Sequence, residues 1–326
     1  MTEIQDLCQK ILLQERRSIA QAITLVESSR QDHRIDALTL LEHLSKSNRQ
    51  ALRIGLSGAP GVGKSTFIES FGLMLIEEGL SVAVLAVDPS STRSGGSILG
   101  DKTRMEKLSR SPQAFIRPSP SLSHLGGVAR RTREAIFVCE AANFDIIIIE
   151  TVGVGQSETM VSEMTDLFLL LLAPAGGDEL QGVKRGIMEI ADLIVVNKAD
   201  GELKAAAART QSDYAGALHL LRRRAQDPKG FPKASQASSI SGIGLDHIWK
   251  DIKFLTEWRK SNGWWKKRRK AQSVHWFESE IRNQLLSVLS DESAVEEEME
   301  KFSKLVSEGN LSPEAAAEKF VAWLKT

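Results

Sequence analysis

Cysteine is scarce in this chain of 326 residues: its two cysteines, Cys8 and Cys139, lie far apart in the sequence. So few thiols exclude a disulfide framework, and no C-x-x-C pair is present to build a zinc site. The six histidines are scattered too, without the paired spacing of a metal-binding segment. We therefore expect a reduced, cytoplasmic protein with two free thiols.

Long hydrophobic runs and an excess of one charge are also missing. No apolar stretch is long enough to span a bilayer, and the first residues lack the apolar core of a signal peptide. Lysine and arginine number 42, and aspartate and glutamate also number 42. We expect no membrane and no nucleic acid as partner. We interpret the basic run after Trp264-Trp265 as a solvated face rather than a nucleic-acid or lipid patch.

What the chain does have is a complete phosphate-binding loop. The pattern G-x-x-x-x-G-K-[ST] is matched by Gly58-Ala59-Pro60-Gly61-Val62-Gly63-Lys64-Ser65. A buried strand is predicted before it, over 52–56, and a helix from Thr66 to Ile76 after it, which is the context that this motif requires. Backbone N–H groups and the helix N-terminus would hold the phosphates. Lys64 can reach the β- and γ-phosphates, and the Ser65 hydroxyl can ligate Mg²⁺.

A second motif predicts that the nucleotide is a guanine nucleotide. Asn197-Lys198-Ala199-Asp200 directly follows a predicted strand and matches the N-K-x-D element of GTP-binding proteins. The Asp200 carboxylate would accept hydrogen bonds from guanine N1–H and from its 2-amino group. Adenine lacks both donors, so the carboxylate would be left unpaired with ATP. Ser238-Ser239-Ile240 is placed to form a second base-contacting loop.

The segment Glu150-Thr151-Val152-Gly153 follows the most apolar predicted strand. Glu150 is positioned to hold Mg²⁺, through water, and the Gly153 N–H can sense the γ-phosphate. The next residue is Val154, where Ras-like enzymes have a glutamine that orients the attacking water. Valine cannot do this, so we expect slow unaided hydrolysis that needs another residue or a partner.

Two aspartates and one loop are further candidates. Asp88 ends the second predicted strand, and Asp101 lies in a Gly-rich segment; each can be a Mg²⁺ or water ligand, or simply a capping residue. The loop over 176–186, which contains Lys184, is either a third switch segment or an ordinary exposed loop.

Strands and helices alternate through the middle of the chain. Apolar strands are expected over 52–56, 81–87, 114–117, 145–150, 167–172 and 193–196. This alternation predicts an α/β fold, a P-loop NTPase with a mostly parallel central sheet flanked by helices, and with ligands at the carboxyl ends of the strands. We expect a helical segment over 1–50, a GTPase domain over 51–262 and a C-terminal helical arm over 263–326.

The two ends of the chain read as amphipathic helices. In the N-terminal segment, Ile19, Ile23 and Val26 share one face, and so do Ile35, Leu38 and Leu41. In the C-terminal arm one face carries Val274, Phe277, Ile281, Leu285 and Leu289. Because the helices within the domain already cover its sheet, we expect this arm to pair with a second copy in a homodimer, rather than to fold back on its own domain.

With these motifs the chain resembles the MeaB/ArgK-type GTPases of the SIMIBI class, which are chaperones of methylmalonyl-CoA mutase. The likeness spans nearly the whole chain, and its most distinctive part is Glu150-Thr151-Val152-Gly153-Val154-Gly155-Gln156-Ser157-Glu158. Other shared stretches include 87–91, 100–105, 124–127 and 178–189. The resemblance implies a homodimeric GTPase that gates delivery of adenosylcobalamin to the mutase and protects or reactivates that enzyme.

Roles implied by the resemblance fall on particular residues. Lys64 and Ser65 become phosphate and Mg²⁺ contacts; Asp88, Asp101 and Glu150 become the acids of the Mg²⁺ and water network. The loop around Lys184 becomes the switch that moves when the mutase binds. Ile240 stands where many GTPases have lysine, so the base pocket departs from the usual pattern there.

Three alternatives stay open. One is a kinase or ATPase acting on a transport binding protein, against which Asp200 argues. Another is a metallocentre-insertion GTPase, although the chain lacks the His- or Cys-rich segment of that group. The last is a nucleotide-switched scaffold without turnover.

Overall fold

The computed structural model describes residues 3–87, 105–118, 125–151, 157–174, 185–221, 224–290 and 293–324. The chain divides into two compact units, Met1–Arg269 and Lys270–Thr326, and each is described by itself. The three parts expected from the sequence, 1–50, 51–262 and 263–326, stay a prediction.

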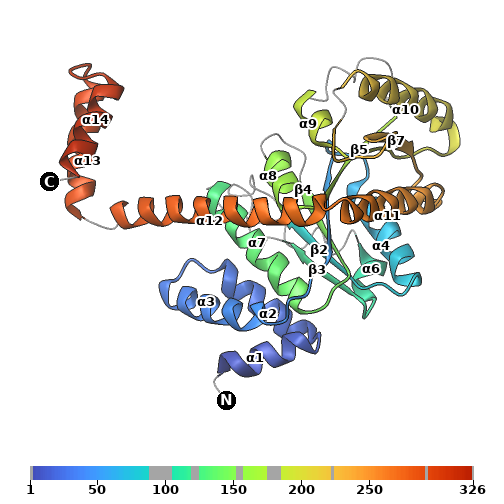
Figure 1. Cartoon of the computed structure of the whole chain (residues 1–326), viewed down its shortest axis with the longest axis horizontal. Coiled ribbons are helices and arrows are strands. Elements are labelled where there is room, and N and C mark those ends of the chain that lie inside the picture. The colour runs from blue at the N-terminus through green and yellow to red at the C-terminus, as the bar shows by residue number, and fades with distance from the viewer. Residues whose placement is uncertain are drawn as a thin grey trace. The chain divides into compact units, whose positions relative to one another are not determined.

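A parallel sheet of seven strands forms the centre of the first unit (Figure 1). The strand order is β3-β2-β4-β1-β5-β6-β7, so β1 and β4 lie side by side in the middle. The α/β class and the parallel sheet predicted from the sequence are confirmed. The strands are β1 (Leu52–Ser57), β2 (Val82–Val87), β3 (Ala114–Pro118), β4 (Ile146–Thr151), β5 (Leu167–Leu172), β6 (Leu193–Val196) and β7 (Lys233–Gln236).

Helices cover both faces of this sheet (Figure 1). The helices of the first unit are α1 (Glu3–Leu12), α2 (Arg16–Glu27), α3 (Gln31–Ser45), α4 (Lys64–Glu77), α6 (Glu106–Arg110), α7 (Leu125–Ala141), α8 (Ser157–Met164), α9 (Arg185–Ile190), α10 (Lys204–His219) and α11 (Leu245–Ser261). A short 3-10 turn, Gly201–Leu203, precedes α10. One core, which contains buried side chains of α4, α6 and α11, fills one face of the sheet. Helices α7 and α8 pack on strands from the other face.

The alternation along β1 explains this arrangement. Ile54 and Leu56 point into the core formed with α4 and α11. Gly55 points to the opposite face, where a Cβ would lie 2.8 Å from the ring of Phe168 and 3.0 Å from Val161 of α8. A side chain at position 55 would therefore push α8 away from the sheet.

The N-terminal helices confirm one predicted face and correct another. Helix α2 buries Ile19, Ile23 and Val26, as expected. Helix α3 buries Ala37, Leu40 and Leu44 instead of the face with Ile35, which is 68% exposed. Both stripes have helical spacing, and α3 packs against α1, α2 and α7 through the stripe that includes the small residue Ala37.

The basic run that follows Trp264 is not simply a solvated face, and that expectation was wrong for its arginines. Arg269 forms ion pairs with Asp166 at 2.6 Å and with Glu140 at 3.0 Å, and it stacks on Trp265. Arg268 donates to the carbonyl oxygens of Ser162 (2.7 Å) and Thr165 (3.1 Å). Only the lysines of the run face solvent, at positions 266, 267 and 270. The arginines stabilise the fold rather than offer a charged surface.

Arg259 is the centre of a second buried ionic cluster. It is 3% exposed and donates to Asp192 at 2.6 Å and to Asp227 at 2.7 Å.

We expect Arg259→Met to lower the free energy of unfolding by about 3–5 kcal/mol, because both carboxylates would remain buried without this partner. Urea unfolding followed by circular dichroism measures this. The control Arg282→Met, an exposed arginine, should change it by less than about 1 kcal/mol; equal losses in both variants would contradict this role of Arg259.

Helix α12 (Trp264–Ser290) begins in the first unit, which ends at Arg269. The second unit consists of the remainder of α12, followed by α13 (Ser293–Ser307) and α14 (Pro313–Trp323). Helices α13 and α14 pack through an edge-on contact of Phe302 with Phe320. Ser312 caps α14 by accepting from the Ala315 N–H, and Pro313 is the first residue of this helix. No helix in the part of the chain that the structure describes has the length and hydrophobicity to cross a membrane.

Candidate nucleotide-binding site

The phosphate loop runs from the end of β1 to the start of α4, as predicted. A Cβ at Gly58 would lie 2.3 Å from the Leu171 carbonyl oxygen of β5. Only glycine therefore fits at position 58, where the chain leaves β1. Gly63 has φ +91°, and a Cβ there would lie 2.7 Å from Asn197 Nδ2. Helix α4 begins directly at Lys64, so its unpaired N–H groups face the loop. This is the geometry of an anion site at a helix N-terminus.

Lys64 lies folded over this loop. Its Nζ donates to the carbonyl oxygens of Gly58 at 2.7 Å and Ala59 at 3.3 Å. Burial lowers the pKa of Lys64, and the nearby charges of Glu150 and Glu158 act against that shift. The carbonyl oxygens of Gly58 and Ala59 therefore hold the ammonium at the phosphate loop, where it can exchange them for phosphate oxygens.

The N-K-x-D element lies at the carboxyl end of β6 and braces the phosphate loop. The Asn197 side chain, 1% exposed, donates to the Val62 carbonyl oxygen at 2.9 Å. Its oxygen accepts from the N–H of Ser239 at 3.1 Å and from the Ser239 hydroxyl at 2.7 Å. Lys198 Nζ donates to the Gly61 carbonyl oxygen at 2.7 Å. The phosphate loop and both predicted base-contacting segments thus form one connected structure.

Asp200 and Ser238 lie together beside this brace. The Ser238 hydroxyl donates to Asp200 Oδ2, and Ser70 of α4 donates to the Ser239 carbonyl oxygen at 2.6 Å. A small hollow of about 50 Å³ opens here. It is lined by Gly63, Thr66, Asn197, Lys198, Asp200, Ser238, Ser239 and Ile240. The structure therefore gathers the two segments that the sequence assigned to the base at the mouth of the phosphate loop.

Ile240 is 84% exposed at the rim of this hollow. An apolar side chain at this place offers a flat surface but no hydrogen bond to a base. Among the side chains that line the hollow, Asp200 carries the carboxylate that the sequence predicts to contact the base.

Glu150 lies near the carboxyl end of β4, the strand beside β1. It pairs with Leu56 across the β1–β4 ladder, just before the phosphate loop, and is 8% exposed. Ser65 lies in the first turn of α4. A hydroxyl and a carboxylate are the hard oxygen donors that Mg²⁺ prefers, and Lys64 places a phosphate-binding cation beside them. These described residues fit a Mg²⁺–nucleotide complex, in which the ion would neutralise phosphate charge.

Four predicted site residues, Asp88, Asp101, Gly153 and Lys184, lie outside the described residues, as does Val154. Their assigned roles stay predictions.

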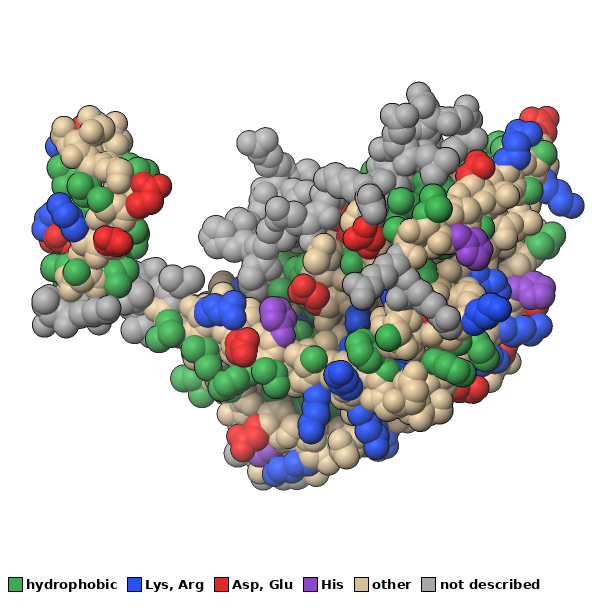
Figure 2. Space-filling model, turned by 45° about the horizontal axis from the view of Figure 1, so that its top comes forward, with side chains coloured by type: hydrophobic (Ala, Val, Ile, Leu, Met, Phe, Trp, Pro, Cys, Tyr) green, Lys and Arg blue, Asp and Glu red, His purple; other side chains and the backbone are tan. Residues whose placement is uncertain are grey.

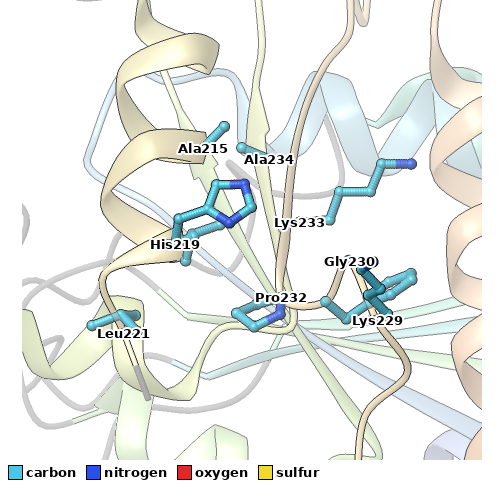
Figure 3. Close-up of a pocket in the computed structure, with 10 residues that line it drawn as sticks. Ala215, His219, Leu221, Lys229, Gly230, Pro232, Lys233 and Ala234 are labelled. Atoms are coloured by element: carbon cyan, nitrogen blue, oxygen red, sulfur yellow. The ribbon is translucent and has the colours of Figure 1, made fainter. Parts of the chain in front are cut away.

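Sequence reasoning missed the part that Glu158 plays as a buried acid close to Lys64. It also gave no sign of a larger hollow of about 400 Å³ between the end of α10 and the segment 229–234. Figure 3 shows the His219 ring at this hollow and the Lys233 amine turned away from it; Lys233 pairs with Asp251 at 2.8 Å. None of the residues that the sequence singled out lines this hollow.

Comparison with known proteins agrees with this site. The family model described as "Methylmalonyl Co-A mutase-associated GTPase MeaB" matches residues 19–294. This match runs from α2 through α12 and includes every predicted nucleotide-binding residue.

Three similar proteins span most of the chain. A protein named putative GTPase from Caulobacter vibrioides is 50% identical over 320 residues, 98% of this chain and 97% of its own length. The mitochondrial methylmalonic aciduria type A homolog of mouse is 46% identical over 96% of this chain and 77% of its own. GTPase ArgK of Escherichia coli is 44% identical, with 96% and 94% covered.

A solved structure has the same architecture over the full length. The crystal structure of a protein named LAO/AO transport system kinase matches with a TM-score of 0.79 and 36% identity, and covers 100% of this chain and 99% of its own. With its P-loop fold and these relatives, the chain belongs to the MeaB family of GTPases.

Proposed function

We propose that this chain hydrolyses GTP to GDP and phosphate and that its turnover serves an adenosylcobalamin-dependent methylmalonyl-CoA mutase, as a gate for cofactor loading and as protection and reactivation of that enzyme. The observation that carries the proposal is the match over residues 19–294 to a family that is named for its association with this mutase. The mouse relative, whose name refers to methylmalonic aciduria, supports the same client.

The residues of the site divide the work of the reaction. The phosphate loop and the start of α4 bind the phosphates, and Lys64 stabilises the negative charge that develops on the γ-phosphate. Asp200, oriented by Ser238, accepts from the guanine base. Mg²⁺, held from Ser65 and Glu150, would neutralise the phosphates. Since Val154 cannot orient water, turnover is slow without the partner.

The kinase alternative has one supporting observation: the protein in the matching crystal structure is named a transport system kinase. It requires ATP as phosphate donor, and the carboxylate of Asp200 would then face a base without its two donors. The metallocentre alternative has less support: among the residues described, no cluster of three or more His, Cys, Asp or Glu side chains is placed to hold a metal ion.

We further propose that the chain is a homodimer paired through its C-terminal arm. Val274, Phe277, Ile281 and Leu285 form an apolar stripe on α12, and their side chains are 42–66% exposed. Figure 2 shows hydrophobic side chains at the surface of the second unit too. An unpaired stripe of this length favours burial against a second copy.

Replacing Phe277 with aspartate is expected to turn the dimer into a monomer, because the charge would be buried without a partner in the paired arm. Light scattering after size exclusion measures the mass. The control is Asn283→Asp, on the opposite side of α12, which should keep the dimer mass. A monomer mass for the unchanged protein would contradict the dimer.

The client is tested with purified proteins. Phosphate release from GTP is measured with and without methylmalonyl-CoA mutase, and ATP serves as the control nucleotide. We expect slow release from GTP that rises at least about tenfold with the mutase, as partner proteins complete such sites, and little release from ATP. GTP turnover that is indifferent to the mutase would keep the GTPase and contradict this client.

A further inference from the structure

Glu158 is a buried acid with no role in the binding and hydrolysis steps proposed above. It lies in the first turn of α8 and is 2% exposed. A carboxylate at such a place is costly unless hydrogen bonds and opposite charge compensate for its lost hydration. The groups that compensate for it therefore indicate what it is for.

A chain of hydroxyl groups leads to this carboxylate from the centre of the sheet. Thr151 Oγ1 donates to Ser57 Oγ at 2.9 Å, and Ser57 Oγ donates to Glu158 Oε1 at 3.4 Å. Ser157 Oγ lies 3.4 Å from the other carboxylate oxygen and donates to it. Ser57 is the last residue before the phosphate loop, and Thr151 is the last residue of β4. Glu158 thus joins three elements where they reach the nucleotide site.

Lys64 supplies an opposite charge. Among the described groups, the carboxylates of Glu158 and Glu150 act on the Lys64 ammonium and raise its pKa against the effect of burial. Glu150 is a candidate Mg²⁺ ligand, so its charge would be shared with the ion. Glu158 lies on α8, behind Ser57, where it accepts from hydroxyl groups of the protein. Its charge therefore continues to act on Lys64 when the nucleotide is bound.

We propose that Glu158 is a positioning residue for hydrolysis: through Ser57 it holds the start of the phosphate loop to the end of β4, and by its charge it keeps the Lys64 ammonium over that loop, where Lys64 donates to Gly58 and Ala59. This rests on the GTP hydrolysis proposed above. Alignment of Lys64 matters most as charge develops on the phosphate in transfer, whereas the backbone of the loop carries ground-state binding. Loss of Glu158 should therefore affect kcat far more than nucleotide affinity.

The test is Glu158→Gln, which keeps the size and a hydrogen-bond acceptor but removes the charge. We expect kcat for GTP to fall about 10–100-fold, as for a displaced catalytic group, with Kd for GDP and GTP within about threefold or tighter. Glu158→Asp, which restores the charge, should recover part of kcat. Glu163→Gln, on the exposed side of the same helix, should behave as the unchanged protein.

Two results would overturn the proposal. One is a kcat in Glu158→Gln within about twofold of the unchanged protein. The other is a parallel loss of kcat, affinity and thermal stability in both Glu158 variants, which would show a structural role alone. The unchanged protein is measured in the same series: if it does not hydrolyse GTP, the proposed function itself fails, so the two failures are told apart.

Discussion

Replacing Lys64 with alanine should lower kcat for GTP hydrolysis by at least about 10²–10³-fold, the range for removing one donor that meets transition-state charge. The ammonium lies over the phosphate loop and is held there by carbonyl oxygens of Gly58 and Ala59. Among the described cations, Lys198 also reaches this loop, but its Nζ is engaged by the Gly61 carbonyl oxygen at 2.7 Å. Because Lys198 is held there, it should not compensate for the loss of Lys64.

The fold should survive this substitution. Lys64 contributes two hydrogen bonds to carbonyl oxygens, worth about 1 kcal/mol each, and its burial already disfavours the charged form. Single-turnover phosphate release measures the effect, and thermal unfolding checks the fold. Lys250→Ala, an exposed lysine of α11, is the control and should keep full activity. Full activity in Lys64→Ala would contradict the P-loop mechanism.

The second large effect is expected at the base. Asp200→Asn should weaken GTP binding about 100-fold, a loss of a few kcal/mol, because the amide would turn a donor toward the N1–H and 2-amino donors of guanine. Ser238 donates to Asp200 Oδ2, so in the variant it should hold the amide oxygen and leave the NH₂ group for the base. Xanthine carries an oxygen where guanine carries the 2-amino group, and it should bind this variant better.

Competition of GTP, XTP and ATP against a fluorescent nucleotide measures the change. The expected result is a preference reversed from GTP to XTP, with ATP still weak. Asp213→Asn, an exposed aspartate of α10, should leave all three affinities unchanged. Unchanged GTP affinity in Asp200→Asn would remove the base-reading role.

The sequence could predict most of the sheet because its strands are short apolar runs buried on both sides. It missed β7, whose residues Lys233-Ala234-Ser235-Gln236 include one apolar side chain. This strand lies at the sheet edge and is fixed by its ladder with β6 and by Gln211 of α10, which donates to the Ala234 carbonyl oxygen at 3.1 Å. Such support comes from tertiary contacts, which a local pattern does not contain.

The candidate site was predictable where a motif fixes both residue type and spacing. The phosphate loop and the Asn197–Asp200 element are of this kind, and the structure brings both to one hollow. The contacts that join them depend on the fold: Asn197 reaches Val62, 135 residues away. Glu158 was part of a motif, yet its place behind Ser57 follows only from the way α8 packs on Gly55.

Charge runs were the least informative pattern. Two neighbouring arginines, Arg268 and Arg269, point into the protein while Lys267 beside them faces solvent. Arginine meets buried carboxylates and carbonyl oxygens with a fork of donors, and lysine does so less readily. On the face that Figure 2 shows, basic and acidic side chains of the described residues are interspersed. Net charge alone could not have separated these roles.

The most direct test of a guanine-reading GTPase is the specificity of its turnover. We would measure kcat/KM of the purified, unchanged protein for GTP and for ATP, with Mg²⁺ present. We predict slow turnover of GTP with a kcat/KM at least about 10³-fold above that for ATP, since the Asp200 carboxylate would face adenine without the two donors that guanine offers, which costs several kcal/mol. Equal values for the two nucleotides, or turnover of ATP alone, would contradict a guanine-reading site built on Asp200.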